Sequence, residues 1–220
     1  MGRNLKFAEG EYYHLYNRGV EGRKLFLDEG DYRRFTSLLY TANGIIPVHL
    51  SNLSKSASPF KSAKGEAIVD IGAWCLMPNH FHILVREKTT NGISLFMKKL
   101  LTGYSMFFNI KRERKGVLFE NTFYAKHLDT DNYLKYQYAY IHLNPIGIID
   151  SGWKEKKIND KNKTKKFLSS YPYSSYLDYT KPEGREELVI LNKEEFPEYF
   201  QTFNEFNSMI NEWIDFEELQ

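Results

Sequence analysis

Two hydrophobic patterns occur in the first half of the chain. Residues 11–18 (EYYHLYNR), 67–77 (AIVDIGAWCLM) and 80–87 (HFHILVRE) are short runs rich in aromatic or β-branched residues, which is typical of β-strands. Residues 28–42 and 91–114 instead repeat apolar residues every three or four positions, as amphipathic helices do. Pro78-Asn79 separates the second and third runs, so we expect these two strands to pair as a hairpin.

The second half of the chain continues the alternation of strands and helices. Residues 117–128 predict a strand with an irregular start, and residues 131–144 predict a helix that ends before Pro145. From about residue 192 the chain is amphipathic and acidic, which predicts one or two further helices. The order of elements and their short connections predict an α+β fold, a mainly antiparallel sheet backed by helices.

Two segments do not follow either hydrophobic pattern. Residues 51–66 are rich in serine and lysine, and we interpret them as a flexible surface insertion. Residues 154–166 carry seven lysines against two acidic residues, which predicts a loop that is either simply solvated or in contact with phosphates. We therefore expect one domain over residues 1–180 and an acidic helical extension over residues 181–220.

The net charge of +2 hides an asymmetry between these two parts. Residues 181–220 hold three basic and eleven acidic residues, net −8, whereas residues 1–180 hold 27 basic and 17 acidic residues, net +10. A basic body favours a polyanionic partner such as nucleic acid, although charge blocks also serve only for solvation. The 16% of aromatic residues would suit stacking on unpaired bases, and equally an ordinary core.

Several protein classes are excluded by composition. A single cysteine, Cys75, rules out a disulfide scaffold. No stretch reaches the roughly 18 consecutive apolar residues of a membrane span, and residues 1–14 lack the pattern of a signal peptide. We expect a protein of the reducing cytoplasm that does not associate with membranes.

The first candidate for chemistry is the pair His80 and His82. Residues two apart on a strand point to the same face, about 6.6 Å apart along the chain, so both imidazoles could bind one metal ion. Histidine also serves as an ordinary polar residue in strands, so the pair by itself leaves both interpretations open.

The second candidate lies on the helix predicted at 131–144. Tyr136, Tyr140 and Asn144 are spaced four residues apart and share one face, whereas Tyr138 faces elsewhere. Such a stripe usually packs against a core. Beside two histidines, however, it would supply a phenol nucleophile and a third metal ligand.

Taken together, these motifs resemble one known family. MPNHFHILV (77–85) is similar to the histidine–hydrophobic–histidine motif of single-tyrosine transposases, and the resemblance continues through about residues 11–180 in the expected order. The nearest branch is the REP-associated tyrosine transposases. The segments that carry it are YHLYNRGVEGRKLF (13–26), LFMKKLLTGYSMFFN (95–109), GVLFENTFYAKHL (116–128), DNYLKYQYAYIHLNPI (131–146) and YPYSSY (171–176).

The resemblance implies a ferredoxin-like fold and roles for particular residues. His80 and His82 match the metal-ligand histidines, Tyr140 matches the catalytic tyrosine, and Asn144 matches the polar residue that completes the protein's share of the metal shell. Tyr136 and Tyr138 are rival nucleophiles, with Tyr136 the stronger. The implied ion is Mg²⁺ or Mn²⁺, although two imidazoles and an amide would also bind zinc or nickel.

The implied activity is cleavage and rejoining of single-stranded DNA by transesterification, through a 5′-phosphotyrosine, in DNA transposition or in the processing of repeat elements. The implied substrate is a hairpin or palindromic single strand, and we expect a monomer rather than a homodimer, associated with the nucleoid. Basic residues that would contact phosphates, or simply be solvated, are Arg18, Lys98, Lys99, Lys111, Arg112, Arg114 and Lys126.

Three alternatives remain. A replication initiator or relaxase would use the same residues, but such proteins usually carry further domains, for which this chain has no room. A domesticated DNA-binding protein would keep the fold without the chemistry. A metal-dependent phosphodiesterase would use the histidines without Tyr140.

Overall fold

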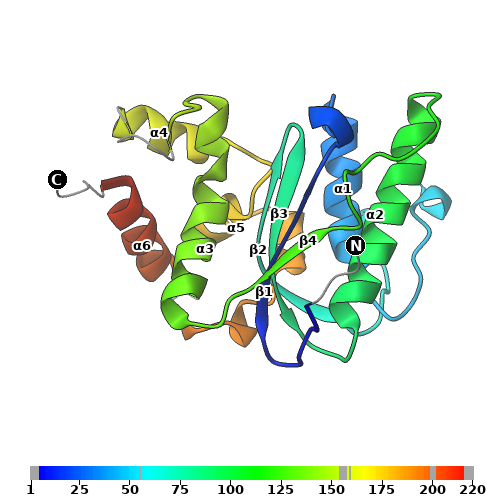
Figure 1. The fold of residues 1–220 in the computed structure, drawn as a ribbon, viewed down its shortest axis with the longest axis horizontal. Coiled ribbons are helices and arrows are strands. Elements are labelled where there is room, and N and C mark those ends of the chain that lie inside the picture. The colour runs from blue at the N-terminus through cyan, green and yellow to red at the C-terminus, as the bar shows by residue number, and fades with distance from the viewer. Residues whose placement is uncertain (1–4, 55, 154–157, 159, 199–201, 216–220) are drawn as a thin grey trace.

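The computed structural model describes residues 5–54, 56–153, 158, 160–198 and 202–215. Its centre is a four-stranded antiparallel sheet in the order β2-β3-β1-β4 (Figure 1). The strands are β1 (Tyr12–Arg18), β2 (Val69–Met77), β3 (His80–Glu87) and β4 (Tyr124–His127). The predicted α+β class and the predicted β2–β3 hairpin are therefore confirmed.

Helices cover both faces of this sheet. The helices α1 (Glu29–Thr41) and α2 (Gly92–Lys111) pack on one face, against Leu15, Phe81 and Ile83. The helices α3 (Asp131–Leu143), α5 (Tyr176–Thr180) and α6 (Phe203–Asp215) lie on the other face, where Leu84 joins a second core (Figure 1). Side chains of β3 therefore alternate between two cores, and the predicted histidines belong to the face toward α3.

The fourth strand is shorter than the sequence pattern predicts. Only Tyr124–His127 form a ladder with β1. Just before them, the side chain of Asn17 donates to the carbonyls of Asn121 (2.8 Å) and Thr122 (3.3 Å). Because a side chain satisfies these backbone carbonyls, Asn121 and Thr122 hold their position outside the ladder. Further back, Phe119 forms an isolated antiparallel bridge with Gly19.

The basic segment 154–166 differs from the predicted loop where it is described. Residues Lys161–Leu168 form helix α4, because Asp160 caps its N-terminus and Thr164 and Leu168 are buried. The prediction of a loop over 154–166 is therefore wrong from Lys161 onward, because the few apolar positions of this segment give little helical pattern. Residues 154–157 and 159 lie outside the described residues.

The acidic tail forms the predicted amphipathic helix. Phe206, Ile210 and Ile214 of α6 are buried at four-residue intervals and join the core beneath α3. The division into a domain and an extension at residue 180 stays a prediction. In the 51–66 segment, described residues include a 3₁₀ helix at Pro59–Lys61, where Phe60 contacts Tyr40. None of the described helices is both long and apolar enough to cross a bilayer.

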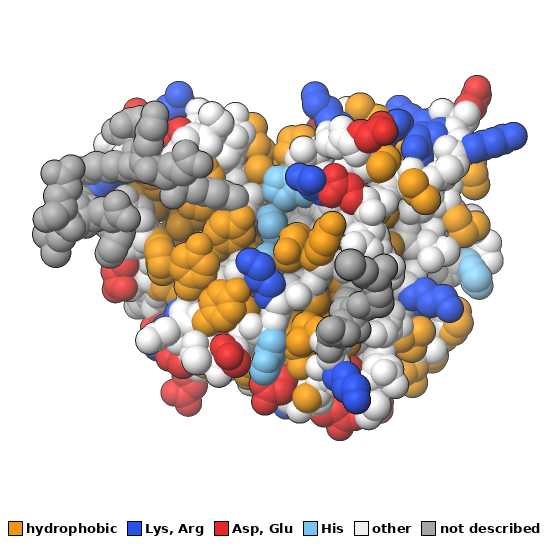
Figure 2. Space-filling model, in the orientation of Figure 1, with side chains coloured by type: hydrophobic (Ala, Val, Ile, Leu, Met, Phe, Trp, Pro, Cys, Tyr) orange, Lys and Arg blue, Asp and Glu red, His pale blue; other side chains and the backbone are white. Residues whose placement is uncertain are grey.

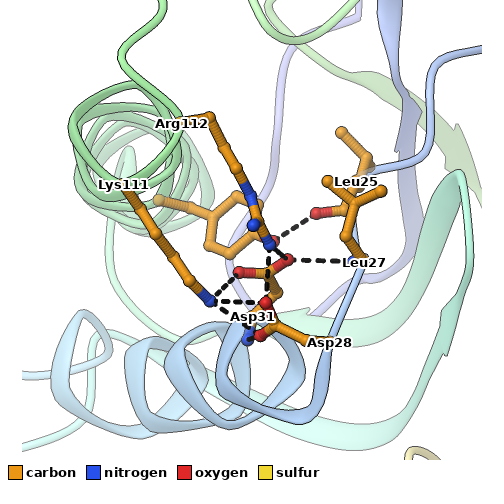
Figure 3. A network of polar contacts seen from close by, with 7 residues as sticks. Leu25, Leu27, Asp28, Asp31, Lys111 and Arg112 are labelled. Carbon is orange, nitrogen blue, oxygen red and sulfur yellow. Dashed lines mark hydrogen bonds and ion pairs between the residues drawn. The ribbon is translucent and has the colours of Figure 1, made fainter.

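An ion-pair network around the buried Asp31 joins the start of α1 to the end of α2 (Figure 3). Lys111 and Arg112 each bridge Asp28 and Asp31, at N···O distances from 2.6 to 2.9 Å. Asp31 is fully buried and also accepts the backbone N–H of Leu27. Burial by itself would raise the pKa of Asp31, but the bonds from Lys111, Leu27 and Arg112 outweigh it and hold the pKa below its ordinary value of 3.8.

We predict that Asp31→Asn lowers the free energy of unfolding by about 1–3 kcal/mol at pH 7, because buried donors lose a charged acceptor. A group with a lowered folded-state pKa stabilises the protein above its ordinary pKa, and this contribution is lost as the pH falls through the lower folded-state value. The difference in the free energy of unfolding between wild type and variant, measured by urea titration, should therefore become smaller below about pH 4. Asp129→Asn, at an exposed position, is the matched control. Equal stability of Asp31→Asn and wild type at pH 7 would contradict the prediction.

A second buried network ties α3 to the sheet. His142 donates from Nδ1 to the carbonyl of Tyr138 (3.0 Å), so its Nε2 accepts from the hydroxyl of Ser175 (2.8 Å). The same hydroxyl oxygen accepts the backbone N–H of Trp74 on β2 (2.9 Å). Burial lowers the pKa of His142 to about 3, so the ring is neutral and fits this pattern.

We predict that Ser175→Ala lowers the free energy of unfolding by about 1–3 kcal/mol, because the Trp74 N–H and His142 Nε2 lose a buried partner. Ser170→Ala, an exposed serine at the end of α4, should change stability by less than about 0.5 kcal/mol. Chemical denaturation of wild type and both variants measures these free energies of unfolding. If the two serine variants were equally stable, the network would contribute nothing to holding α3.

Candidate functional site

The register of the sheet lines up chemically active side chains in rows. Residues paired across antiparallel strands point to the same face, so His82, Tyr16 and Tyr124 form one row across β3, β1 and β4. The pair His80–Arg18 forms a second row and the pair His14–Lys126 a third. All of them share the face covered by α3, because they are an even number of residues apart along each strand.

A cavity of about 520 Å³ opens at these rows. Figure 2 shows histidine side chains in a hollow between the α3–α6 side and the α1–α2 side of the molecule, with hydrophobic side chains gathered beside them over α3. The cavity is lined by Tyr16, Asn17, Arg18, Asn79, His80, His82, Glu120, Tyr124 and Tyr140. The cavity therefore brings together residues with three predicted roles: the nucleophile Tyr140, the metal ligands His80 and His82, and the phosphate contact Arg18.

Helix α3 places Tyr140 against the histidines. Its ring centroid lies 5.5 Å from that of His82 and 6.3 Å from that of His14, edge to face in both cases. Tyr136, one turn earlier and exposed, stacks on Tyr140 at 6.1 Å and contacts Trp213 of α6 at 5.2 Å. Tyr138 is fully buried on the opposite side of α3, among Tyr179 and Phe206. Tyr140 therefore lines the cavity, whereas Tyr138 does not.

Each predicted ligand histidine has its Nδ1 atom in a hydrogen bond. His80 Nδ1 lies 2.7 Å from Asn79 Oδ1, and His82 Nδ1 lies 2.8 Å from His14 Nε2. An amide oxygen only accepts, so His80 carries its proton on Nδ1 in this contact. If His14 accepts likewise, both ligand histidines are protonated at Nδ1, and their Nε2 atoms are the nitrogens suited to a metal ion.

The residues present fit a divalent cation that also binds substrate. Asn144, in the 3₁₀ turn that follows α3, brings its Oδ1 to 3.4 Å from His80 Nε2. Neighbouring ligands of an octahedral Mg²⁺ lie about 3 Å apart, close to this separation. Among the described residues no cluster of three or more His, Cys, Asp or Glu side chains could hold a metal. Two imidazoles and one amide would leave about half of the octahedral shell to phosphate oxygens and water.

The predicted phosphate contacts do not all come together. Arg18 and Lys126 lie on the site face, and Arg18 pairs with Glu120 while its side chain stays 64% exposed. Lys98 lies on the exposed side of α2. Lys99 donates to the carbonyl of Gly44, and Arg114 to Asn109 and Val117.

Lys111 and Arg112 hold Asp28 and Asp31 in the network of Figure 3, on the far layer of the molecule. A DNA contact by any of these seven residues stays a prediction. The geometry favours Arg18, Lys126 and Lys98 over the others.

Sequence patterns alone did not single out three residues of this site. His14, Tyr16 and Tyr124 join it only through strand pairing. The available signal was the two-residue spacing of His14, Tyr16 and Arg18, which predicts one shared face of β1. Burial lowers the pKa of His14 to about 3, with Lys126 adding to the effect, so this ring is neutral beside His82.

Comparisons with known proteins show what the chain is similar to. Residues 53–144 match the family model "Transposase IS200 like". The match confirms the resemblance to the transposase family. The matched segment contains His80, His82, Tyr140 and Asn144. No curated protein sequence matches the chain significantly.

Two solved structures are similar to the transposase-like chain. A REP-associated tyrosine transposase bound to a REP hairpin has a TM-score of 0.52 at 14% identity, over 80% of this chain and 82% of that chain, which shows the same fold. The tRNA(His) guanylyltransferase of Saccharomyces cerevisiae has a TM-score of 0.38 at 11% identity, over 91% of this chain and 86% of that chain. We draw no argument from the second.

We predict that His14→Leu weakens Mn²⁺ binding by about 10- to 100-fold, because His82 loses the partner that sets its tautomer. In wild type, imidazole ¹⁵N spectra should report His82 protonated at Nδ1, and the variant should lose this preference. His127→Gln changes another histidine of the sheet, one paired with Glu11 on the opposite face, and should do neither. Unchanged Mn²⁺ affinity together with an unchanged His82 tautomer in His14→Leu would contradict the assignment.

Proposed function

We propose that this chain is a metal-dependent single-stranded DNA endonuclease and strand transferase that acts in DNA transposition or in the processing of repeat elements. The observation that carries the proposal is the meeting of Tyr140, His80 and His82 at one cavity, with the buried Asn144 in contact with His80. These residues come from two distant parts of the sequence and lie in the segment that matches the transposase family model.

In the proposed reaction the Oη atom of Tyr140 attacks the scissile phosphorus. The phenol gives its proton to water, a bond forms between Oη and phosphorus, and the bond from phosphorus to the 3′-oxygen breaks. The 3′-oxygen takes a proton from water and leaves as a hydroxyl, while the 5′-phosphate stays on Tyr140. Attack by another 3′-hydroxyl reverses these steps, so the phosphodiester energy is conserved and no nucleotide cofactor is required.

The chain's own residues have defined tasks in this scheme. His80, His82 and Asn144 would hold Mg²⁺ or Mn²⁺, which supplies charge stabilisation at a non-bridging phosphate oxygen. Arg18, exposed at the mouth of the cavity, would bind a neighbouring phosphate. Tyr136, stacked on Tyr140, would keep the Tyr140 ring oriented toward the cavity.

The proposed partner is single-stranded DNA with a hairpin or palindromic repeat. The REP-associated transposase of similar fold is described as bound to a REP hairpin, which supports this substrate class. We further propose a monomer, in which Tyr140 and the metal-ligand histidines of one active site come from the same chain. The bonds from His142 through Ser175 to Trp74, and the packing of α6 under α3, support this arrangement.

The decisive test is covalent capture. Oligonucleotide hairpins taken from the sequences that flank the gene are incubated with protein and Mn²⁺ or Mg²⁺ and separated on a denaturing gel. We expect a slow-migrating protein–DNA adduct with wild type, a similar adduct with Tyr136→Phe, and none with Tyr140→Phe, because phenylalanine lacks the attacking oxygen.

Other outcomes would revise the proposal in different ways. Loss of the adduct only in Tyr136→Phe would move the nucleophile one turn along α3. Cleavage without an adduct, undisturbed in Tyr140→Phe, would point to a phosphodiesterase that uses the histidines. Tight binding with neither cleavage nor adduct would favour a DNA-binding protein that has lost the chemistry.

A further inference from the structure

Tyr124 is an exposed aromatic residue beside the reactive groups. It begins β4 at the edge of the sheet, and 36% of its surface is accessible to solvent. Its row across the sheet continues through Tyr16 to His82. The side chain of Tyr124 is therefore accessible from solvent where it lines the cavity of the predicted nucleophile and ligands.

The rings of this row form a stack. The centroids of Tyr124 and Tyr16 lie 5.2 Å apart, with their planes inclined by 18°. Tyr16 stacks in turn on His14 at 4.9 Å and contacts His82 at 6.0 Å. Tyr124 is thus the outer member of an aromatic stack that starts at a predicted metal ligand.

The stack is held rigidly at its outer end. Asn17 donates to two backbone carbonyls just before Tyr124, and the ladder between β4 and β1 holds the residues after it. A fixed ring binds a planar partner with little loss of conformational freedom.

Tyr124 also lines two cavities. One is the 520 Å³ cavity of the reactive groups, and the other is a groove of about 1020 Å³ between α2 and residues 116–125. The groove is mainly apolar, which suits the faces of bases, and it also carries hydroxyl and amide side chains and the exposed Lys98, which suit sugars and phosphates. Its polar lining comprises Ser94, Lys98, Thr102, Ser105, Asn109, Asn121 and Thr122.

The charges around Tyr124 suit a phosphate backbone. Lys126 lies two residues along the same face of β4, and Arg18 lies on β1 beside it. The carboxylate of Glu120, which lines the first cavity, is paired with Arg18 and so is partly neutralised.

We propose that the ring of Tyr124 is the stacking platform for one unpaired base near the scissile phosphate, and that the strand continues from this base into the groove beside α2. The inference rests on the proposed function for the identity of the ligand, single-stranded DNA. It adds the position at which a base is bound and the path of the strand. Stacking tolerates every base, so this subsite positions the strand without selecting its sequence.

The test uses binding alone, with Tyr140→Phe protein and EDTA, so that neither cleavage nor a metal ion contributes. Hairpin oligonucleotides carry 2-aminopurine at each unpaired position in turn. We expect strong quenching at one position, lost in Tyr124→Ala and kept in Tyr124→Phe. Tyr124→Ala should weaken binding about 5- to 150-fold. The control Phe203→Ala removes another exposed aromatic side chain, at the start of α6, and should change neither quantity.

A double-mutant cycle decides whether ring and base touch. An abasic site at the quenched position should weaken binding to the Tyr124 protein by a similar factor but have little further effect on Tyr124→Ala. Additive losses, or quenching that persists in Tyr124→Ala, would overturn the inference. If wild type forms the adduct but the losses of affinity in the cycle are additive, the proposed function stands and this subsite is rejected. Coupling without any adduct would support the subsite in a protein that binds DNA without cleaving it.

Discussion

The alternation of side chains along the two central strands is the constraint on which the site depends. On β1 and β3, Leu15, Phe81 and Ile83 point into the core beneath α1 and α2, while the histidines point toward α3. A shift of one residue in this register would turn His80 and His82 into that core and place its apolar side chains on the site face, at a large cost in hydrophobic energy. The packing of one face therefore determines what the other face presents. Tyr16, His14 and Arg18 take their places on the site face for the same reason.

The segment after α4 protects the open edge of the sheet and, in doing so, positions the tyrosine helix. In the described part of the chain β2 has no strand beyond it, and its backbone is instead bonded by the region 171–192. Tyr171 donates to the carbonyl of Leu76 (2.6 Å), Tyr179 to that of Gly72 (2.7 Å), and Ser175 pairs with both Trp74 and His142. Side chains thus satisfy an edge that would otherwise be available for pairing with another chain. The YPYSSY motif is explained by this structural task.

The distribution of charge follows from the same division into layers. Lys111 and Arg112 contribute to the basic total of residues 1–180, yet they hold Asp28 and Asp31 far from the cavity. Arg18 and Lys126 occupy the site face because strand alternation places them there. Asp28 and Asp31 already offset the charges of Lys111 and Arg112 in the net +10, so it is the number of basic residues that overstates how many positive charges are available at the site. Contacts within the fold neutralise part of the charge before any ligand arrives.

The sequence by itself determined most of the helices and strands and the chemistry that single faces present, because these depend on spacing along one element. The strand His80–Glu87, the cap at Asp28 and the shared face of Tyr136 and Tyr140 follow from periods of two and four residues. Only the tertiary structure decided which faces meet. Strand pairing brought His14 to His82 and Tyr16 to Tyr124, and the helix at Lys161–Leu168 formed where a capping residue and two buried side chains outweighed a run of lysines. Contacts between residues distant in sequence leave no periodic signal in one chain, so their partners became visible only once the sheet was assembled.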